Sequence, residues 1–194
     1  VQVIRHLWRD WSDDGGGVRT VVYGLAADLL SSASRTAASL RVLVPGCGAC
    51  RLVHDLAQQL PCGSVVEGID TSAPLLAVYE QLRRAEEERA LVLYPQPESA
   101  PRLGVRVALP LPRLPHHNSA VTTHASFEPA WWDEPERAGA YDAVVTAYVL
   151  DVLAVGPLAA AAGISTLLKP GTGVWIHVGA LELPRRVAEQ RRAC

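Results

Sequence analysis

A short glycine-containing turn constrains the fold of this chain more than any other feature of its sequence. Residues 41–44 form an aliphatic and β-branched run typical of a strand buried on both faces, and Pro45 ends it. Gly46 and Gly48 can adopt positive φ angles and have no Cβ, so the main chain there can pass close to a ligand. This pattern predicts a strand, a tight turn and a helix that begins near Cys50.

An acid at the end of the next apolar run completes the pattern. Asp70 follows residues 65–69 and lies roughly 20 residues after the glycines, where the second strand of a βαβ unit ends beside the first. A carboxylate at that position can accept hydrogen bonds from both ribose hydroxyls, and Glu67 is a weaker candidate for the same role. We therefore predict a nucleotide-binding unit. Its ligand stays open between a dinucleotide and S-adenosylmethionine, because Cys50 replaces the third glycine of the dinucleotide fingerprint.

The rest of the chain predicts one alternating α/β domain. Residues 1–39 carry helical patterns, and residues 40–194 carry the sheet, with a proline-rich insertion at about 94–118. We expect further strands at 141–148 and 174–179, separated by a helix at about 157–168. Too little chain follows Gly179 for a helix and a final antiparallel hairpin, so we expect the sheet to lack that hairpin.

Composition and charge exclude several classes of function. Hydrophobic residues make up 49% of the 194 residues, which is enough for one packed core. The net charge of −2 gives no electrostatic basis for nucleic-acid binding. No apolar run reaches the roughly 18 residues of a membrane helix, and no secretory signal is visible. We expect a soluble cytoplasmic protein, with the nucleus as an alternative compartment, no membrane partner, and a homodimer left open.

Two of the four cysteines, Cys47 and Cys50, permit a different interpretation. A Cys-x-x-Cys motif where a strand meets a helix resembles thioredoxin, in which the helix terminus lowers the pKa of a thiol. A thiol–disulfide oxidoreductase would leave Asp70 without a role. A zinc site completed by His116 and His117 is weaker still, because adjacent histidines in an extended chain point in different directions, so we expect no metal.

Five short motifs, taken in order, resemble those of one enzyme family. They occupy residues 9–12, 42–52, 94–95, 144–151 and 168–179. On these motifs the chain is similar to the N2227-like, or carnosine N-methyltransferase, family over almost its whole length. The resemblance implies a Rossmann-like class I methyltransferase sheet preceded by N-terminal helices. It also implies S-adenosylmethionine as cofactor and an imidazole-bearing acceptor, such as carnosine or a related peptide.

The resemblance also implies roles for individual residues. Asp151 matches the family's substrate-contacting Asp, and a carboxylate there would bind one imidazole N–H and stabilise the cation that forms on the ring. Tyr148 is expected beside the acceptor, at the end of the same strand. Arg9 is expected to contact the cofactor carboxylate. The full set of expected cofactor residues is Arg9, Gly46, Gly48, Asp70, Ser126 and Phe127.

Departures from the family pattern keep a second hypothesis open. Ser126 stands where the family has the Asp of a Gly-Asp-Phe motif, and His6 stands where it has a Gln. Residues 179–184 lack the family's Tyr and His. Cys50, Ser126 and the short C-terminus favour a degenerate methyltransferase domain that binds cofactor or a protein partner without turnover. Asp151 likewise has a structural alternative, as the N-cap of the next helix.

Overall fold

A five-stranded parallel sheet forms the centre of the computed structural model, which describes residues 2–13, 16–33, 38–84, 91–93, 107–109 and 118–179. The strand order is β5-β2-β1-β6-β7, and every neighbouring pair is parallel. This arrangement confirms the predicted Rossmann-like α/β class. The strands are β1 (Arg41–Pro45), β2 (Val65–Asp70), β5 (Ser119–His124), β6 (Ala143–Ala147) and β7 (Val174–Val178).

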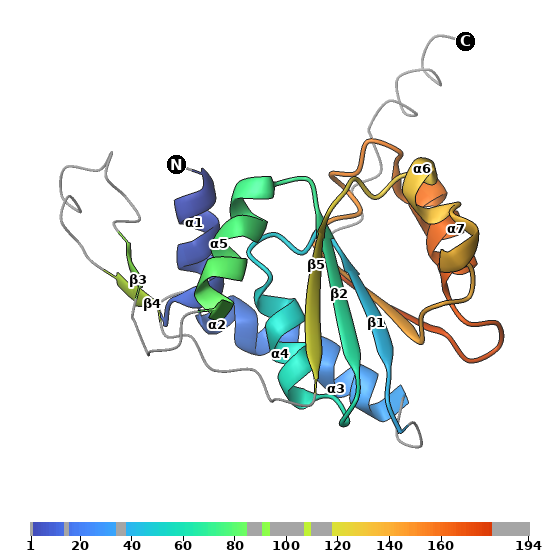
Figure 1. Cartoon of the computed structure of the whole chain (residues 1–194), viewed down its shortest axis with the longest axis horizontal. Helices are drawn as coiled ribbons and strands as arrows, with labels where there is room; N and C mark the ends of the chain where they lie inside the picture. Colours follow the sequence, from blue (N-terminus) through green and yellow to red (C-terminus); the bar gives the residue numbers. More distant parts are fainter. Residues whose placement is uncertain are drawn as a thin grey trace, which may run out of the picture.

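Helices cover both faces of this sheet (Figure 1). On one side lie α1 (Gln2–Trp11), α3 (Gly24–Ala33), α4 (Arg51–Gln59) and α5 (Ala73–Arg84). The short helix α2 (Gly16–Val18) and the π-helix η1 (Arg19–Tyr23) lead into α3. On the other side lie α6 (Pro129–Trp132), the 3-10 turn η3 (Pro135–Arg137) and α7 (Pro157–Leu167).

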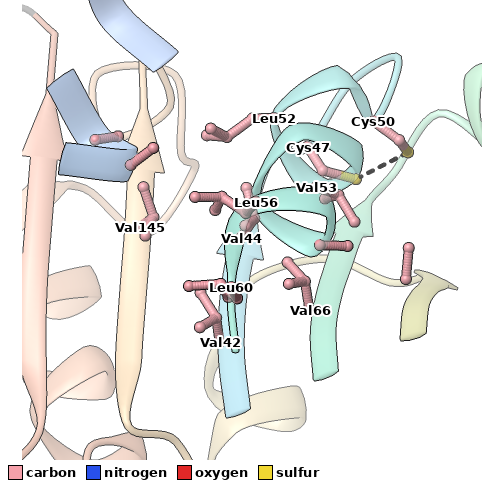
Figure 2. Close-up of a cluster of buried hydrophobic side chains, with 14 of the residues drawn as sticks. Val42, Val44, Cys47, Cys50, Leu52, Val53, Leu56, Leu60, Val66 and Val145 are labelled. Carbon is pink, nitrogen blue, oxygen red and sulfur yellow. Dashed lines mark hydrogen bonds between the residues drawn. The ribbon is translucent and has the colours of Figure 1, made fainter. Parts of the chain in front are cut away.

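Alternation of side chains along the strands produces two separate hydrophobic cores. Val42, Val44 and Val66 pack toward α4, as Figure 2 shows. Leu43 and Val144 point to the opposite face and pack among residues of α6 and α7. Because helices bury both faces, the central strands need a continuous apolar run, which explains why their sequence predicted them.

One strand of the sheet was missing from the sequence-based expectations. β5 pairs with β2 along all six of its residues, from Ser119 to His124, and forms the outer strand beside β2. Only Ala120 among these six residues is buried, so the strand can form from a mostly polar sequence. Such a sequence contains no apolar run from which the strand could be predicted. The strand expected at 141–148 is shorter, because Tyr141 makes only an isolated bridge and Tyr148 has a φ of 51°.

The expected proline-rich insertion is described only in part. β3 (Leu91–Leu93) and β4 (Val107–Leu109) pair antiparallel in a small separate sheet. The rest of the insertion, including His116 and His117, and the segment after Gly179 lie outside the described residues. Within the described ranges, no cluster of three potential metal ligands occurs, and no helix has the length and apolarity needed to cross a membrane.

The contact between α6 and α7 generates a stability prediction. A Cβ on Gly163 of α7 would lie 2.5 Å from Trp132 Cδ2, so the indole rests where a side chain would otherwise be. Gly163→Ala would gain about 1 kcal/mol of helix propensity but would overpack the core at a cost of about 1–3 kcal/mol. We expect a net decrease in the free energy of unfolding, measured by denaturant titration.

Gly24→Ala is the matched control, because a Cβ on Gly24 would meet nothing within 4 Å. The same chemical change should be neutral there or stabilise by up to about 1 kcal/mol. Equal stabilities for the two variants would show that the contact with Trp132 does not limit position 163.

Candidate functional site

A cavity of about 810 Å³ opens where β1, β2 and β6 end. Its wall includes Val44, Asp70 and Ala147, one residue from each of these strands. The carboxyl ends of parallel strands, at the point where strand order reverses, are where α/β sheets bind ligands. The volume lies within the range of about 300–1,000 Å³ that is usual for small-molecule sites.

The glycine turn between β1 and α4 forms the floor of this cavity. Gly46 has a φ of 63° and Gly48 a φ of 54°, the left-handed conformation that favours glycine. A Cβ on Gly46 would lie 2.3 Å from Val149 Cγ2, so the turn lies directly against the segment that follows β6. Cys50 is the N-cap of α4 and, although not a glycine, also has a positive φ of 60°.

Asp70 joins this turn to the end of β2. Its Oδ2 accepts a hydrogen bond from Gly48 N–H at 2.8 Å, and its Oδ1 accepts one from Ser72 N–H at 2.8 Å. The carboxylate is half-buried and lies in the cavity wall, where the sequence predicted it. Glu67, the weaker candidate, does not line the cavity. It is buried in the other core, where it accepts a 2.7 Å hydrogen bond from the Tyr141 hydroxyl.

Helix α1 closes one side of the cavity with Val3, His6 and Arg9. Arg9 donates from Nε and Nη2 to the two carboxylate oxygens of Asp10 at 2.5 and 2.8 Å. These hydrogen bonds raise the pKa of Arg9, against the opposing effect of burial, so its positive charge is secure at the cavity wall. His6 Nδ1 lies 3.3 Å from Arg9 Nη2.

Trp11 connects α1 to the glycine turn, a role that the sequence did not reveal. The indole is fully buried, and its Nε1 donates a 2.8 Å hydrogen bond to the carbonyl oxygen of Ala49. The guanidinium of Arg51, in the first turn of α4, lies over the indole ring at 4.9 Å. The available signal was the position of Trp11 in the motif at residues 9–12, but tryptophan in a helix usually indicates only a core contact.

The loops after β5 and β6 form the other walls. Ser126 and Phe127 line the cavity after β5, and Phe127 is buried against Trp132, with ring centroids 4.8 Å apart. Tyr148 lies at the rim and is 54% exposed. Its φ of 51° is unusual for a bulky residue, and its N–H donates to Val178 O at 2.9 Å. Such backbone strain is concentrated at functional sites.

Asp151 is the one expected site residue that the structure does not bring to the cavity. Its side chain is exposed, although Val149 and Val152 on either side of it line the wall. The alternative interpretation as a helix N-cap is wrong, because α7 begins at Pro157 and Gly156 is its N-cap. The residues that do meet at the cavity are Arg9, Gly46, Gly48, Asp70, Ser126, Phe127 and Tyr148, and Asp70 is the only carboxylate among the described lining residues.

The two cysteines of the Cys-x-x-Cys motif are both buried. Their sulfur atoms lie 3.5 Å apart, and the hydrogen bond with Cys47, together with burial, raises the pKa of the Cys50 thiol. A thioredoxin-like enzyme needs an accessible thiol with a lowered pKa, which can attack the disulfide of another protein. The geometry therefore argues against the oxidoreductase interpretation.

The contact between Gly46 and Val149 gives a test of how tightly the turn is held. Gly46→Ala must tolerate a Cβ at a positive φ, which costs about 1–2 kcal/mol, and the clash with Val149 adds about 1–3 kcal/mol. Gly48→Ala shares the positive φ, but its nearest contact would be His6 Nδ1 at 3.8 Å, so only the backbone cost applies. We expect Gly46→Ala to lower the free energy of unfolding by more than Gly48→Ala.

Adding Val149→Ala to Gly46→Ala should recover part of the loss that is due to the clash, because it removes Cγ2 at 2.3 Å but keeps the Val149 Cβ at 2.9 Å. The same addition to Gly48→Ala should recover nothing. Denaturant titrations that show equal losses for the two glycine variants would contradict the close approach of the turn to Val149.

Comparisons with known proteins show which family and which solved structures this chain is similar to. The sequence model described as carnosine N-methyltransferase matches residues 1–184. No curated protein matches by sequence. A protein from Galdieria sulphuraria, assigned as a sarcosine dimethylglycine methyltransferase, superposes with a TM-score of 0.50 at 14% identity, over 79% of this chain and 44% of its own.

A second solved structure shares the fold more completely. A protein from Methanococcus maripaludis, assigned as an S-adenosylmethionine-dependent methyltransferase, superposes with a TM-score of 0.52 at 13% identity. The match covers 93% of this chain and 69% of that one, whereas this chain spans less than half of the Galdieria protein. At these identities the two structures establish the fold alone. The family match over residues 1–184 goes further, and the chain belongs to the carnosine N-methyltransferase family.

Proposed function

We propose that this protein is an S-adenosylmethionine-dependent N-methyltransferase that acts on the imidazole of a histidine-containing acceptor, such as carnosine or a related peptide. The observation that carries the proposal is the cavity where Gly46, Gly48 and Asp70 meet, in a chain of this family. The family match supports the reaction type, and the cavity supports a nucleoside ligand.

The residues of the cavity fit the cofactor. Each carboxylate oxygen of Asp70 accepts one backbone N–H, and each retains acceptor capacity for a ribose hydroxyl. A Cβ on Gly48 would project into the space between the turn and His6, so glycine leaves that space to a ligand. Phe127 offers an aromatic wall for a base, and Arg9 offers a positive charge for a carboxylate.

The acceptor half of the cavity is apolar. Tyr148, Val149, Val152 and Leu153 line it after β6. S-adenosylmethionine supplies a methyl group activated by a sulfonium, so the protein has to align the acceptor nitrogen and exclude water more than it has to transfer protons. An imidazole becomes cationic as it is methylated, and a nearby carboxylate would stabilise that charge. Asp151 remains our candidate for this carboxylate.

One observation favours a second function, a binding domain without turnover. Asp151 does not line the cavity, and Asp70, the only described carboxylate that does, already accepts two backbone hydrogen bonds. Such a domain would bind S-adenosylhomocysteine but would transfer no methyl group to any member of a panel of histidine dipeptides. A methyl-transfer assay over that panel distinguishes the two functions.

The cofactor assignment predicts the effect of removing Asp70. Asp70→Ala should weaken binding of S-adenosylhomocysteine by about 1–3 kcal/mol, because the ribose hydroxyls lose their charged acceptor. Isothermal calorimetry measures the change, and circular dichroism checks the fold. Glu67→Gln is the control on the same strand. It should lower stability, because Glu67 is buried with Tyr141, but it should leave affinity unchanged. Unchanged affinity in a folded Asp70→Ala protein would remove Asp70 from the site.

The acceptor assignment predicts a different pattern for Asp151. Asp151→Asn should leave affinity for S-adenosylhomocysteine unchanged and lower kcat/KM for an imidazole acceptor by about 100-fold, because an amide does not offset the charge that develops on the ring. Asp28→Asn, an exposed change on α3, should leave the rate unchanged. Wild-type turnover by Asp151→Asn would make Asp151 a spectator and would move the acceptor carboxylate elsewhere.

A further inference from the structure

The glycine turn and the helix start that follows it carry two thiols, Cys47 and Cys50, and the mechanism above uses neither. Cys47 Sγ and Cys50 Sγ lie 3.5 Å apart, as the dashed line in Figure 2 shows. Cys47 is 9% exposed and lines the cavity, whereas Cys50 is fully buried behind it. A small molecule in the cavity therefore reaches Cys47 first, and Cys50 is the next sulfur.

We propose that Cys47 and Cys50 form an oxidative modification site, at which hydrogen peroxide entering the cavity produces a reversible intramolecular disulfide that closes the cofactor site. Bound cofactor shields Cys47, so occupancy and oxidation exclude each other. Disulfide formation stands on the geometry of the thiols alone, whereas the coupling to occupancy rests on the proposed cofactor cavity.

The chemistry balances with peroxide as the only added reagent. The Cys47 thiolate attacks one peroxide oxygen, the O–O bond breaks, and the other oxygen leaves as hydroxide, which takes up the proton lost by Cys47. The product is a sulfenic acid on Cys47. Cys50 Sγ then attacks the Cys47 sulfur, the S–O bond breaks, and the hydroxyl departs with the Cys50 proton as water. Two thiols are oxidised to one disulfide, and one peroxide is reduced to two waters.

The disulfide would require the turn to move. A sulfur–sulfur bond is about 2.05 Å long, so the two sulfur atoms must approach by about 1.5 Å. Cys47 has little room to shift, because its Sγ packs against β2, where a Cβ on Gly68 would lie 2.9 Å from it. Cys50 is fully buried at the start of α4, with a φ of 60° and an N–H that donates to Cys47 O at 2.9 Å, so the approach requires the backbone between the two cysteines to deform.

That movement would directly strain the hydrogen bonds of the residues expected to bind the cofactor. Gly48 and Ala49 are the only residues between the two cysteines. Gly48 N–H donates to Asp70, and Ala49 O accepts the hydrogen bond from Trp11. Pulling Cys50 toward Cys47 puts strain on both of these bonds. The carboxylate expected to bind the ribose is then oriented by only one of its two N–H donors, that of Ser72.

The test uses the full chain with Cys62→Ser and Cys194→Ser, so that only Cys47 and Cys50 retain thiols. Intact mass spectrometry after hydrogen peroxide should show the loss of two hydrogen atoms, restored by dithiothreitol. The oxidised form should bind S-adenosylhomocysteine at least about tenfold more weakly than the reduced form, the equivalent of one lost charged hydrogen bond. Saturating S-adenosylhomocysteine should slow the oxidation by at least about tenfold when 90% or more of the cavity is occupied, as follows from mass action.

Cys50→Ser in the same background separates the disulfide from simple oxidation of Cys47. This variant should gain oxygen instead of losing hydrogen, because no second thiol is present to close the bond. An unchanged mass, or oxygen addition in the protein that retains both thiols, overturns the modification site. A disulfide that leaves affinity unchanged overturns the coupling. Failure of the reduced protein to bind S-adenosylhomocysteine instead overturns the proposed function, while the mass change still decides whether the disulfide forms.

Discussion

The hydrogen bond from Gly48 N–H to the Asp70 carboxylate holds the candidate site together. It depends on the parallel pairing of β1 and β2, whose register places Pro45 beside Ile69 and so brings the glycine turn opposite Asp70. The N–H of Cys47 also donates to Ile69 O at 3.1 Å, which extends the pairing into the turn.

Two segments distant in sequence hold the turn from opposite sides. Trp11 of α1 binds the carbonyl of Ala49, and Val149 after β6 occupies the space that a side chain on Gly46 would need. The turn is thus confined between an N-terminal helix and the segment that follows β6. Since α1 also contributes His6 and Arg9 to the wall, the N-terminal helix belongs to the site as well as to the core.

The half of the cavity that we propose for the cofactor and the half that we propose for the acceptor differ in the side chains that line them. The cofactor half contains backbone donors, a hydrogen-bonded carboxylate and an arginine whose charge is secured by Asp10. The acceptor half consists of apolar side chains and the strained Tyr148 at the rim. The solved structures at 13–14% identity share the fold that places this half at the carboxyl ends of the strands. The second half is formed by the loop after β6, and loops on a rigid scaffold carry substrate choice.

The sequence by itself determined the features that depend on local physical requirements. Strands covered by helices on both faces need continuous apolar runs, so β1 and β2 were visible, and a positive φ near a ligand requires the glycines of the turn. Asp70 followed from the nearly constant length of a βαβ unit. The five motifs indicated the family that the match over residues 1–184 confirms.

Only the tertiary structure decided which distant side chains meet. β5 is an outer strand with little burial, so its polar sequence contained no signal until β2 paired with it. Packing between segments far apart in the chain brings Trp11 into contact with the glycine turn. It also places Glu67 beside Tyr141. Asp151 is an expected site residue whose side-chain position the sequence did not determine. The family resemblance, together with its position just after a strand, assigned it to the acceptor. Side-chain direction in a turn depends on the local backbone, and in this structure the Asp151 side chain is exposed and does not line the cavity.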